Sequence, residues 1–177
     1  MLIRGKIVII LTFVALFFTT CVFGPNRSTG VVSYRDDRVY LRNLDHFQVG
    51  QLPGGWERMR TRVRTITFYN EGLGSTISTD AYCGKNVEAR LLDSLSGDIL
   101  NAFDKKQVIS EKEFDLDGRG AVRQLIAGEL DGVAVTVDLV IVRKNECVFD
   151  FYSVSEGGIS PETTNAFELF FEGFHYE

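Results

Sequence analysis

Most of the chain after residue 45 consists of short segments in which apolar and polar residues alternate. Alternation with period two is the pattern of a β-strand with one buried face. It occurs in three segments before residue 84, "HFQVG", "ERMRTRVRTITFYN" and "STISTDAYC". Four more follow residue 106, namely "QVISEKEFD", "AVRQLIAGEL", "VAVTVDLVIVR" and "CVFDFYSV". The last four are joined by pairs typical of tight hairpin turns, Asp117-Gly118, Asp131-Gly132 and Lys144-Asn145. The pattern predicts an antiparallel meander. Its strand at 133–143 is apolar on nearly both faces and should be central.

Two segments change to helical spacing. Between residues 87 and 103, apolar side chains recur every four positions, at Val87, Leu91, Leu95, Ile99 and Phe103. A second helix is predicted to begin at Ser160-Pro161, with Ser as the N-cap, and to carry an apolar stripe of Phe167, Phe170, Phe171 and Phe174. Two helices with apolar stripes must cover a sheet. The predicted fold is therefore α+β, an antiparallel sheet of about six to seven strands packed by two main helices.

The N-terminus, "MLIRGKIVIILTFVALFFTTC", is typical of a targeting segment. Arg4 and Lys6 precede a continuous apolar run from Ile7 to Phe18, which is short for a membrane span and suits a signal sequence. Cys21 follows directly, as in bacterial lipoproteins, where this thiol is acylated and the chain is cut before it. Phe18 and Thr20 depart from the small residues of that pattern. An uncleaved anchor helix, 7–23, and a plain secreted protein stay open.

This interpretation gives three regions: a lipoprotein-type signal at 1–20, a flexible tether at 21–39 and one α+β domain at 40–177. The tether is inferred from an aperiodic mixture of Gly, Pro, Ser, Thr and charged residues. The folded part is expected in the cell envelope, membrane-anchored and facing the periplasm or the extracellular side.

Cysteine usage agrees with that location. Apart from Cys21, the chain has Cys83 and Cys147, and two thiols in an exported domain are expected to pair. The bridge would close a loop of 64 residue steps and stabilise the fold by roughly 4 kcal/mol. Two separate buried thiols are the alternative.

Charge bears on the partner. Residues 1–20 contain two basic residues and no acid, so removing them lowers the net charge from −5 to −7. Phosphate backbones repel a body this acidic, which argues against nucleic acid.

One segment nevertheless carries four alternating arginines, Arg58, Arg60, Arg62 and Arg64. On one strand they would share a face. They could be neutralised by an acidic ladder, Glu111, Glu113, Asp115 and Asp117, on a neighbouring strand. Alternatively they form an open strip that binds lipid headgroups or an acidic partner.

The sequence shows no pattern typical of a catalytic or metal centre. His46 and His175 lie far apart, without ligand spacing, and no G-x-S-x-G or phosphate loop is present. We therefore expect no metal, no cofactor and no enzymatic activity. An enzyme would have to use sheet carboxylates such as Glu111, Glu113, Asp115 or Asp138.

The order of elements around "LPGGW" (52–56) resembles the Mog1/PsbP-like family. The motif follows a short strand and precedes a hairpin, a helix, a meander and a final helix ending near "FEGF". The resemblance covers most of residues 45–174. It implies an α+β sandwich and a non-catalytic binding or assembly role, often at membranes.

These observations favour a membrane-tethered lipoprotein that holds an envelope protein partner. An extracytoplasmic carrier of a lipid or small molecule, or an enzyme using sheet carboxylates, is the alternative.

Overall fold

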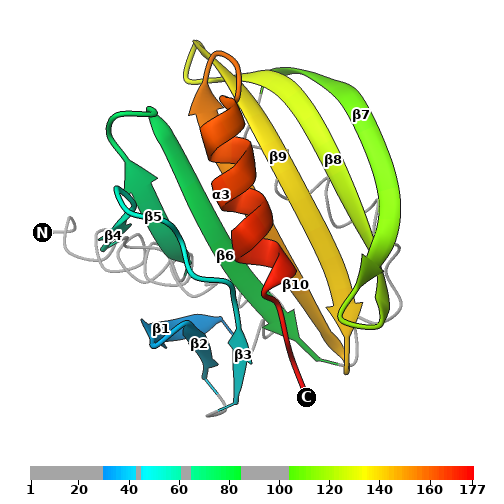
Figure 1. Cartoon of the computed structure of the whole chain (residues 1–177). Helices are drawn as coiled ribbons and strands as arrows, with labels where there is room; N and C mark the ends of the chain where they lie inside the picture. The colour runs from blue at the N-terminus through cyan, green and yellow to red at the C-terminus, as the bar shows by residue number, and fades with distance from the viewer. Residues whose placement is uncertain (1–29, 43–44, 61–64, 85–103) are drawn as a thin grey trace, which may run out of the picture.

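Two antiparallel β-sheets and one helix are seen in the computed structural model (Figure 1), which describes residues 30–42, 45–60, 65–84 and 104–177. The first sheet has the order β1-β2-β3, with strands at Val31–Arg35, Arg38–Leu41 and His46–Gln48. The second has the order β4-β5-β6-β10-β9-β8-β7. Its strands span, in that order, Glu57–Met59, Ile66–Asn70, Ser75–Cys83, Cys147–Glu156, Val133–Lys144, Arg119–Leu130 and Asp104–Leu116. The helix α3 spans Pro161–Glu172.

The predicted meander is confirmed. Strands β7 to β10 follow one another as antiparallel neighbours. Asp117 and Asp131 adopt positive φ angles of 53° and 51° before their glycines, as tight hairpin turns require. The last turn lies one residue later than predicted, because Asn145 and Glu146 are the pair with positive φ. Strand β9 lies inside the sheet and is buried continuously from residue 135 to 142, as its two apolar faces predicted.

Helix α3 runs along one face of the large sheet, over β10 (Figure 1). Its N-cap is Ser160, whose side chain accepts the Thr163 N–H at 3.1 Å, and its apolar stripe is buried. Aromatic rings fill the space beneath it in edge-to-face and tilted pairs, a geometry that adds stability beyond area burial. The fully or nearly fully buried rings are Phe47, Phe149, Phe151, Phe167, Phe170, Phe171 and Phe174.

The predicted tether boundary is wrong. Residues 31–39 lie within β1 and β2, and both Val31 and Val39 are buried. The hairpin turns at Asp36-Asp37, where both residues have positive φ. Burial of the valines against the aromatic core explains why this polar-looking stretch folds. The described fold thus includes a three-stranded sheet of which only β3 was predicted.

The single strand predicted over 57–70 is also wrong. Strands β4 and β5 pair with each other as antiparallel neighbours, Glu57 opposite Tyr69 and Met59 opposite Thr67. The chain therefore reverses direction between Met59 and Ile66. Residues 61–64, which contain Arg62 and Arg64, lie outside the described residues. The predicted helix at 87–103 and the signal segment at 1–20 lie outside the described residues.

The two sheets join around the C-terminal segment. Gln48 and His175 exchange backbone hydrogen bonds of 2.9 and 3.2 Å. Gly50 N–H donates to the Phe170 carbonyl at 2.8 Å. Phe47 packs its ring 5.0 Å from that of Phe149. The first sheet is thus attached to the large sheet through β3, α3 and the chain's end.

Candidate functional site

The predicted arginine row is only partly described. Arg58 lies on β4 and Arg60 just after it, both exposed, whereas Arg62 and Arg64 lie outside the described residues. The Arg58 side chain turns toward the first sheet. Its Nη1 donates to the Tyr34 carbonyl at 3.0 Å, and its guanidinium lies 5.7 Å from the Tyr34 ring centre.

The proposed partnership between the arginines and the acidic ladder is wrong for this strand. Strand β4 forms one edge of the large sheet and β7, with Glu111, Glu113 and Asp115, forms the other. Five strands lie between them. At about 4.8 Å per strand the separation is roughly 29 Å, several screening lengths at physiological salt. Arg58 on β4 therefore cannot form a cross-strand pair with the acidic ladder on β7.

Arg58 instead joins a basic surface on the first sheet. Arg35 and Arg38 are directly opposite each other in the β1–β2 ladder and both are exposed. The Arg35 guanidinium lies 5.7 Å from the Tyr40 ring centre and donates to the Tyr40 hydroxyl at 3.4 Å. We call Arg35, Arg38, Tyr40 and His46 on the outer face of this sheet, with Arg58 at its β1 edge, the arginine surface. Sequence reasoning found Arg58 but missed Arg35 and Arg38, because it assigned their segment, 21–39, to a tether.

Rings and backbone hold these cations in place. Tyr40 and His46 stack with ring centres 5.5 Å apart. Tyr34 packs its ring edge against Phe68, and its hydroxyl donates to Asp37 at 2.7 Å. Burial and this carboxylate raise the pKa of Tyr34. Asp36 pairs with Arg35 at 3.6 Å, but both side chains are largely exposed, so the pair contributes little. Forked guanidinium donors of this kind suit phosphate or carboxylate oxygens.

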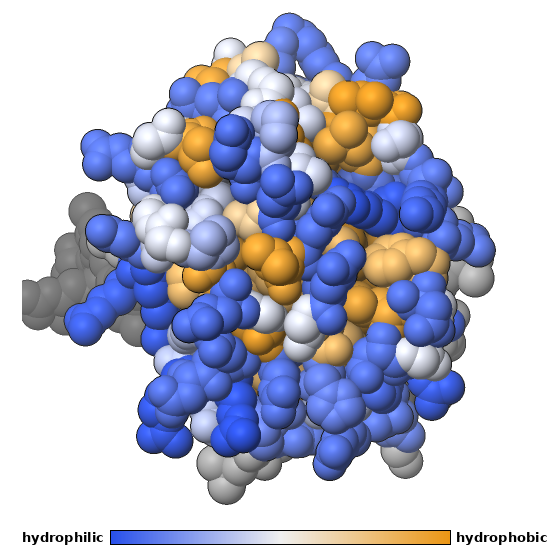
Figure 2. All heavy atoms as spheres, viewed as in Figure 1, coloured by the Kyte–Doolittle hydropathy of each residue, from blue (hydrophilic) through white to orange (hydrophobic). Residues whose placement is uncertain are grey.

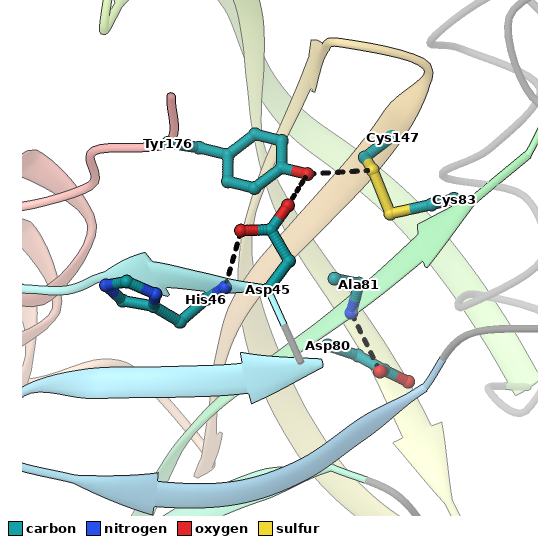
Figure 3. The surroundings of a disulfide bond; sticks show 7 residues. All are labelled: Asp45, His46, Asp80, Ala81, Cys83, Cys147 and Tyr176. Atoms are coloured by element: carbon teal, nitrogen blue, oxygen red, sulfur yellow. Dashed lines mark hydrogen bonds between the residues drawn. A yellow bond between two sulfur atoms is a disulfide. The ribbon is translucent and has the colours of Figure 1, made fainter. Parts of the chain in front are cut away.

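The predicted disulfide is confirmed and lies beside the C-terminus (Figure 3). Cys83 and Cys147 are directly opposite at the end of the β6–β10 ladder. The Tyr176 hydroxyl is 3.8 Å from the Cys147 sulfur and donates to Asp45 at 2.7 Å. Asp45 also accepts the His46 N–H at 2.8 Å. Burial, followed by the Asp45 hydrogen bond, raises the pKa of Tyr176 to about 12. The bridge is thus connected to His46 of the arginine surface through three successive contacts, by way of Tyr176 and Asp45.

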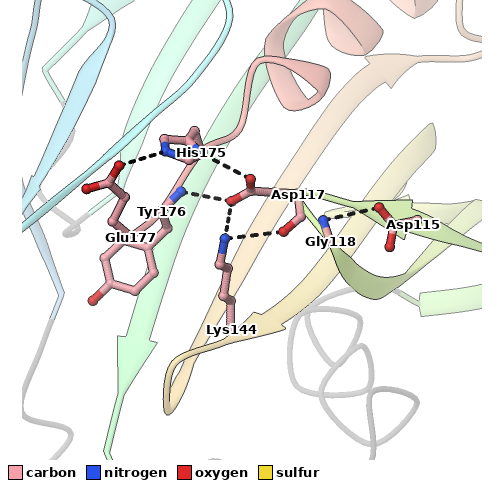
Figure 4. A network of polar contacts seen from close by, with 7 residues as sticks. All are labelled: Asp115, Asp117, Gly118, Lys144, His175, Tyr176 and Glu177. Atoms are coloured by element: carbon pink, nitrogen blue, oxygen red, sulfur yellow. Dashed lines mark hydrogen bonds and ion pairs between the residues drawn. The ribbon is translucent and has the colours of Figure 1, made fainter.

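A second polar network ties the C-terminus to two hairpin turns (Figure 4). The Asp117 carboxylate accepts Lys144 Nζ at 2.7 Å, the Tyr176 N–H at 3.0 Å and His175 Nδ1 at 3.0 Å. Partial burial alone would raise the pKa of Asp117, but these donors lower it to about 2. The pKa of His175 is raised, first by Asp117 and then by Glu177. This network joins the chain's end to the β7–β8 turn and to the end of β9.

The candidate catalytic acids do not converge. Asp138 faces α3, where it binds Arg123 at 2.7 and 2.9 Å, while Arg123 also binds Glu168 at 2.7 Å. Glu111 lies on the opposite face of the sheet, where it accepts Gln124 Nε2 at 2.5 Å. The remaining two, Glu113 and Asp115, are exposed along β7.

Sequence reasoning missed a buried acid pair. Asp80 and Asp150 are directly opposite on β6 and β10, and both are nearly inaccessible to solvent. Asp80 accepts the Tyr82 hydroxyl at 2.7 Å and the Ala81 N–H at 2.8 Å, while burial raises its pKa. Each aspartate stands two residues before a tyrosine, in "DAY" and "DFY", a repeated pattern that could have drawn attention to them.

Two searches of the described residues gave negative results. In residues 30–42, 45–60, 65–84 and 104–177, no three His, Cys, Asp or Glu side chains are grouped so as to hold a metal ion. Within the same ranges, no helix combines the length and the hydropathy that a bilayer crossing needs.

Comparison with known proteins finds likeness of fold. No family model matches the sequence, and no curated protein matches it either. A structure from Bacteroides thetaiotaomicron matches with a TM-score of 0.54 and 13% identity, covering 74% of this chain and 45% of that one. This chain therefore spans less than half of that protein.

Two further structures match with lower scores. Cyanobacterial PsbP (CyanoP) from Synechocystis has a TM-score of 0.49 and 11% identity, over 84% of this chain and 91% of that one. LpqN of Mycobacterium tuberculosis, described as involved in cell envelope biogenesis, has a TM-score of 0.47 and 13% identity. The match covers 75% of this chain and 83% of that one. The predicted Mog1/PsbP-like resemblance is thus supported as a likeness of fold. At these identities it carries no statement about activity or partner.

Proposed function

We propose that this chain is an exported, N-terminally anchored module of the cell envelope that binds a partner without catalysing a reaction. The observation that carries the proposal is the Cys83–Cys147 disulfide. Structural disulfides persist in oxidising compartments and are rare in the cytosol. The bridge therefore agrees with the apolar leader and with Cys21 as its modified residue.

Three features support binding rather than carriage or catalysis. Aromatic rings fill the space between α3 and the large sheet, where a lipid carrier would need a groove. The arginine surface is exposed and preorganised, as recognition of an anionic partner requires. The acids that an enzyme would use are dispersed over two faces and an edge of the sheet. We therefore favour the binding module over the two alternatives, a carrier of a lipid or small molecule and an enzyme.

The test is the state of Cys21 in protein expressed as the full chain in a bacterial host. We expect membrane fractionation, a mature N-terminus at Cys21 and a mass increase equal to its acyl groups. Cys21→Ser should lose the acylation. Cys83→Ser/Cys147→Ser is the matched control, because it removes the other two cysteines and their disulfide and should leave acylation of Cys21 intact. Wild-type protein that begins at Met1, carries no lipid and stays in the cytosol would contradict the proposal.

A further inference from the structure

The charge of the chain is divided unequally along its length. Residues 1–64 contain ten basic and four acidic residues, a net charge of +6. Residues 65–177 contain nine basic and twenty acidic residues, a net charge of −11, and the two parts give the total of −5. Every described basic residue of the first part lies on the first sheet, directly after β2 or around β4. Arg4 and Lys6 belong to the predicted signal, so after its removal residues 21–64 carry a net charge of +4 against −11 for the remainder. The described basic residues of this part lie near Asp36, Asp37, Asp45 and Glu57, so the basic character is local to the outer face of the first sheet and to β4.

We propose that the arginine surface docks on the anionic phosphate headgroups of the bilayer that holds the leader. This inference rests on the proposed function, because it requires the chain to be anchored through its N-terminus. Docking would fix the orientation of the module on the membrane, which a flexible tether alone cannot do.

The outer face of the first sheet has the composition that headgroup binding needs. Its outward strand positions contain no carboxylate, since they are occupied by Ser33, Arg35, Arg38, Tyr40, His46 and Gln48. The nearest carboxylate is that of Asp36 in the turn, whose 3.6 Å pair with Arg35 is largely exposed and contributes little. The two guanidinium groups are opposite each other, and Arg58 adds a third at the β1 edge. Forked donors match phosphate oxygens, and amphipathic rings such as Tyr40 suit the boundary between water and lipid.

The position of the surface in the chain also favours the membrane. Strand β1 begins at Val31, ten positions after Cys21 in the sequence, so it is close along the chain to the proposed anchor. The view in Figure 2 is hydrophilic at the lower left, where Figure 1 places β1 and β2. The carboxylate-rich strand β7 lies at the far edge of the large sheet. Docking through the arginine surface therefore keeps the Glu111, Glu113 and Asp115 carboxylates of β7 away from anionic lipid.

An acidic protein could in principle occupy the same guanidinium groups, but the closeness of the anchor favours lipid. An anchored surface meets the headgroups of its own bilayer at high effective concentration, since the encounter is intramolecular. Each arginine near an anionic bilayer strengthens docking by about fivefold. Removing both Arg35 and Arg38 should therefore weaken it by roughly 25-fold.

The native fluorophore allows a test on the full chain. Trp56 is the single tryptophan and lies two residues before Arg58. The full chain would be placed in lipid nanodiscs whose headgroups carry a nitroxide quencher, with or without phosphatidylglycerol in phosphatidylcholine. The test variant is Arg35→Gln/Arg38→Gln. The control, Lys112→Gln/Arg119→Gln, removes two exposed positive charges from the acidic part.

We expect stronger quenching of Trp56 with phosphatidylglycerol, in wild type and control alike. The test variant should lose this difference. Raising the salt from 0.1 to 1 M should also remove it, because the screening length falls from about 10 Å to about 3 Å. Equal quenching in both lipids by protein that stays in the discs would overturn the docking. The docking would also be overturned if Trp56 quenching changed on addition of an acidic polypeptide but did not depend on the charge of the lipid. Protein that leaves the discs in both lipids would overturn the anchor, and the docking with it.

Discussion

Gly50 lies where the chain leaves β3 and passes against the end of α3. A Cβ atom there would lie 1.8 Å from the Leu169 carbonyl oxygen and 2.8 Å from its carbon. Both are backbone atoms, so no rotamer change can make room. Gly50→Ala must therefore push the first sheet away from the helix and weaken the 2.8 Å hydrogen bond from Gly50 N–H to Phe170.

The cost follows from these two effects. Forcing a methyl group into a well-packed contact costs about 1–3 kcal/mol, and losing one hydrogen bond adds about 0.5–1.5 kcal/mol. We expect Gly50→Ala to lower the free energy of unfolding by about 2–4 kcal/mol, which corresponds to a fall in Tm of roughly 5–15 °C. Gly158 supplies the control. A Cβ there meets nothing within 4 Å and its φ is not left-handed, so Gly158→Ala should be neutral or stabilise by up to about 1 kcal/mol.

The assay is thermal and urea unfolding of both variants, followed by circular dichroism and by Trp56 fluorescence. Equal Tm values for Gly50→Ala and Gly158→Ala would refute the reasoning, because the two substitutions add the same methyl group and differ only in what surrounds it. The close approach of β3 to α3 would then not be a constraint of the native fold.

Three further results are expected. Cys83→Ala/Cys147→Ala should lower the free energy of unfolding by about 4 kcal/mol, measured by urea unfolding against wild type with and without reductant, and reduced wild type should match the variant. The pKa of Asp117 is lowered from 3.8 to about 2. The ionised carboxylate therefore stabilises the folded state above pH 3.8, and this contribution is lost as the pH falls from 3.8 to about 2. Asp117→Asn should therefore flatten the pH dependence of unfolding in that window by about 1–2 kcal/mol. Arg123→Met should cost about 3–5 kcal/mol by leaving Asp138 buried without its partner, and Arg123→Met/Asp138→Leu should recover most of it; equal losses in both proteins would contradict this account.

Elements with strong local signals could be predicted from the sequence. The strand 75–83 was located to the residue, because turn residues at 71–74 and the change of pattern after Cys83 mark both of its ends. Helix α3 was recognised by its serine cap, its proline and its phenylalanine spacing. Each signal lies within a few residues of the structure that it specifies, so no tertiary information was needed.

The sequence-based predictions were wrong where tertiary contacts determine the local structure. Strands β4 and β5 pair as antiparallel neighbours, but the sequence between them, "RTRVRT" at 60–65, contains no Gly, Pro, Asn or Asp to mark a turn. Strands β1 and β2 were hidden by charged residues around Asp36-Asp37, and only burial of Val31 and Val39 reveals them as part of the core.

Most of the candidate site depended on these same elements. Arg58 was identified by its pattern, but Arg35 and Arg38 become neighbours only once the β1–β2 hairpin forms. The order of strands in the large sheet places the acidic ladder at the far edge from β4. That strand order depends on packing between segments that are distant in the sequence. The alternation of charges along one segment does not indicate which strands become neighbours.

The C-terminal segment explains how a small sheet can present a fixed surface. His175 pairs with β3 through its backbone, and Tyr176 bonds Asp45 beside His46 of the arginine surface. The same two residues bond Asp117 in the large sheet. Tyr176 also packs at the disulfide that closes the β6–β10 ladder. The C-terminal segment therefore connects the arginine surface to two hairpin turns and to the disulfide, and these contacts hold the first sheet in place. A surface supported in this way loses less conformational entropy on binding than a mobile tether carrying the same charges.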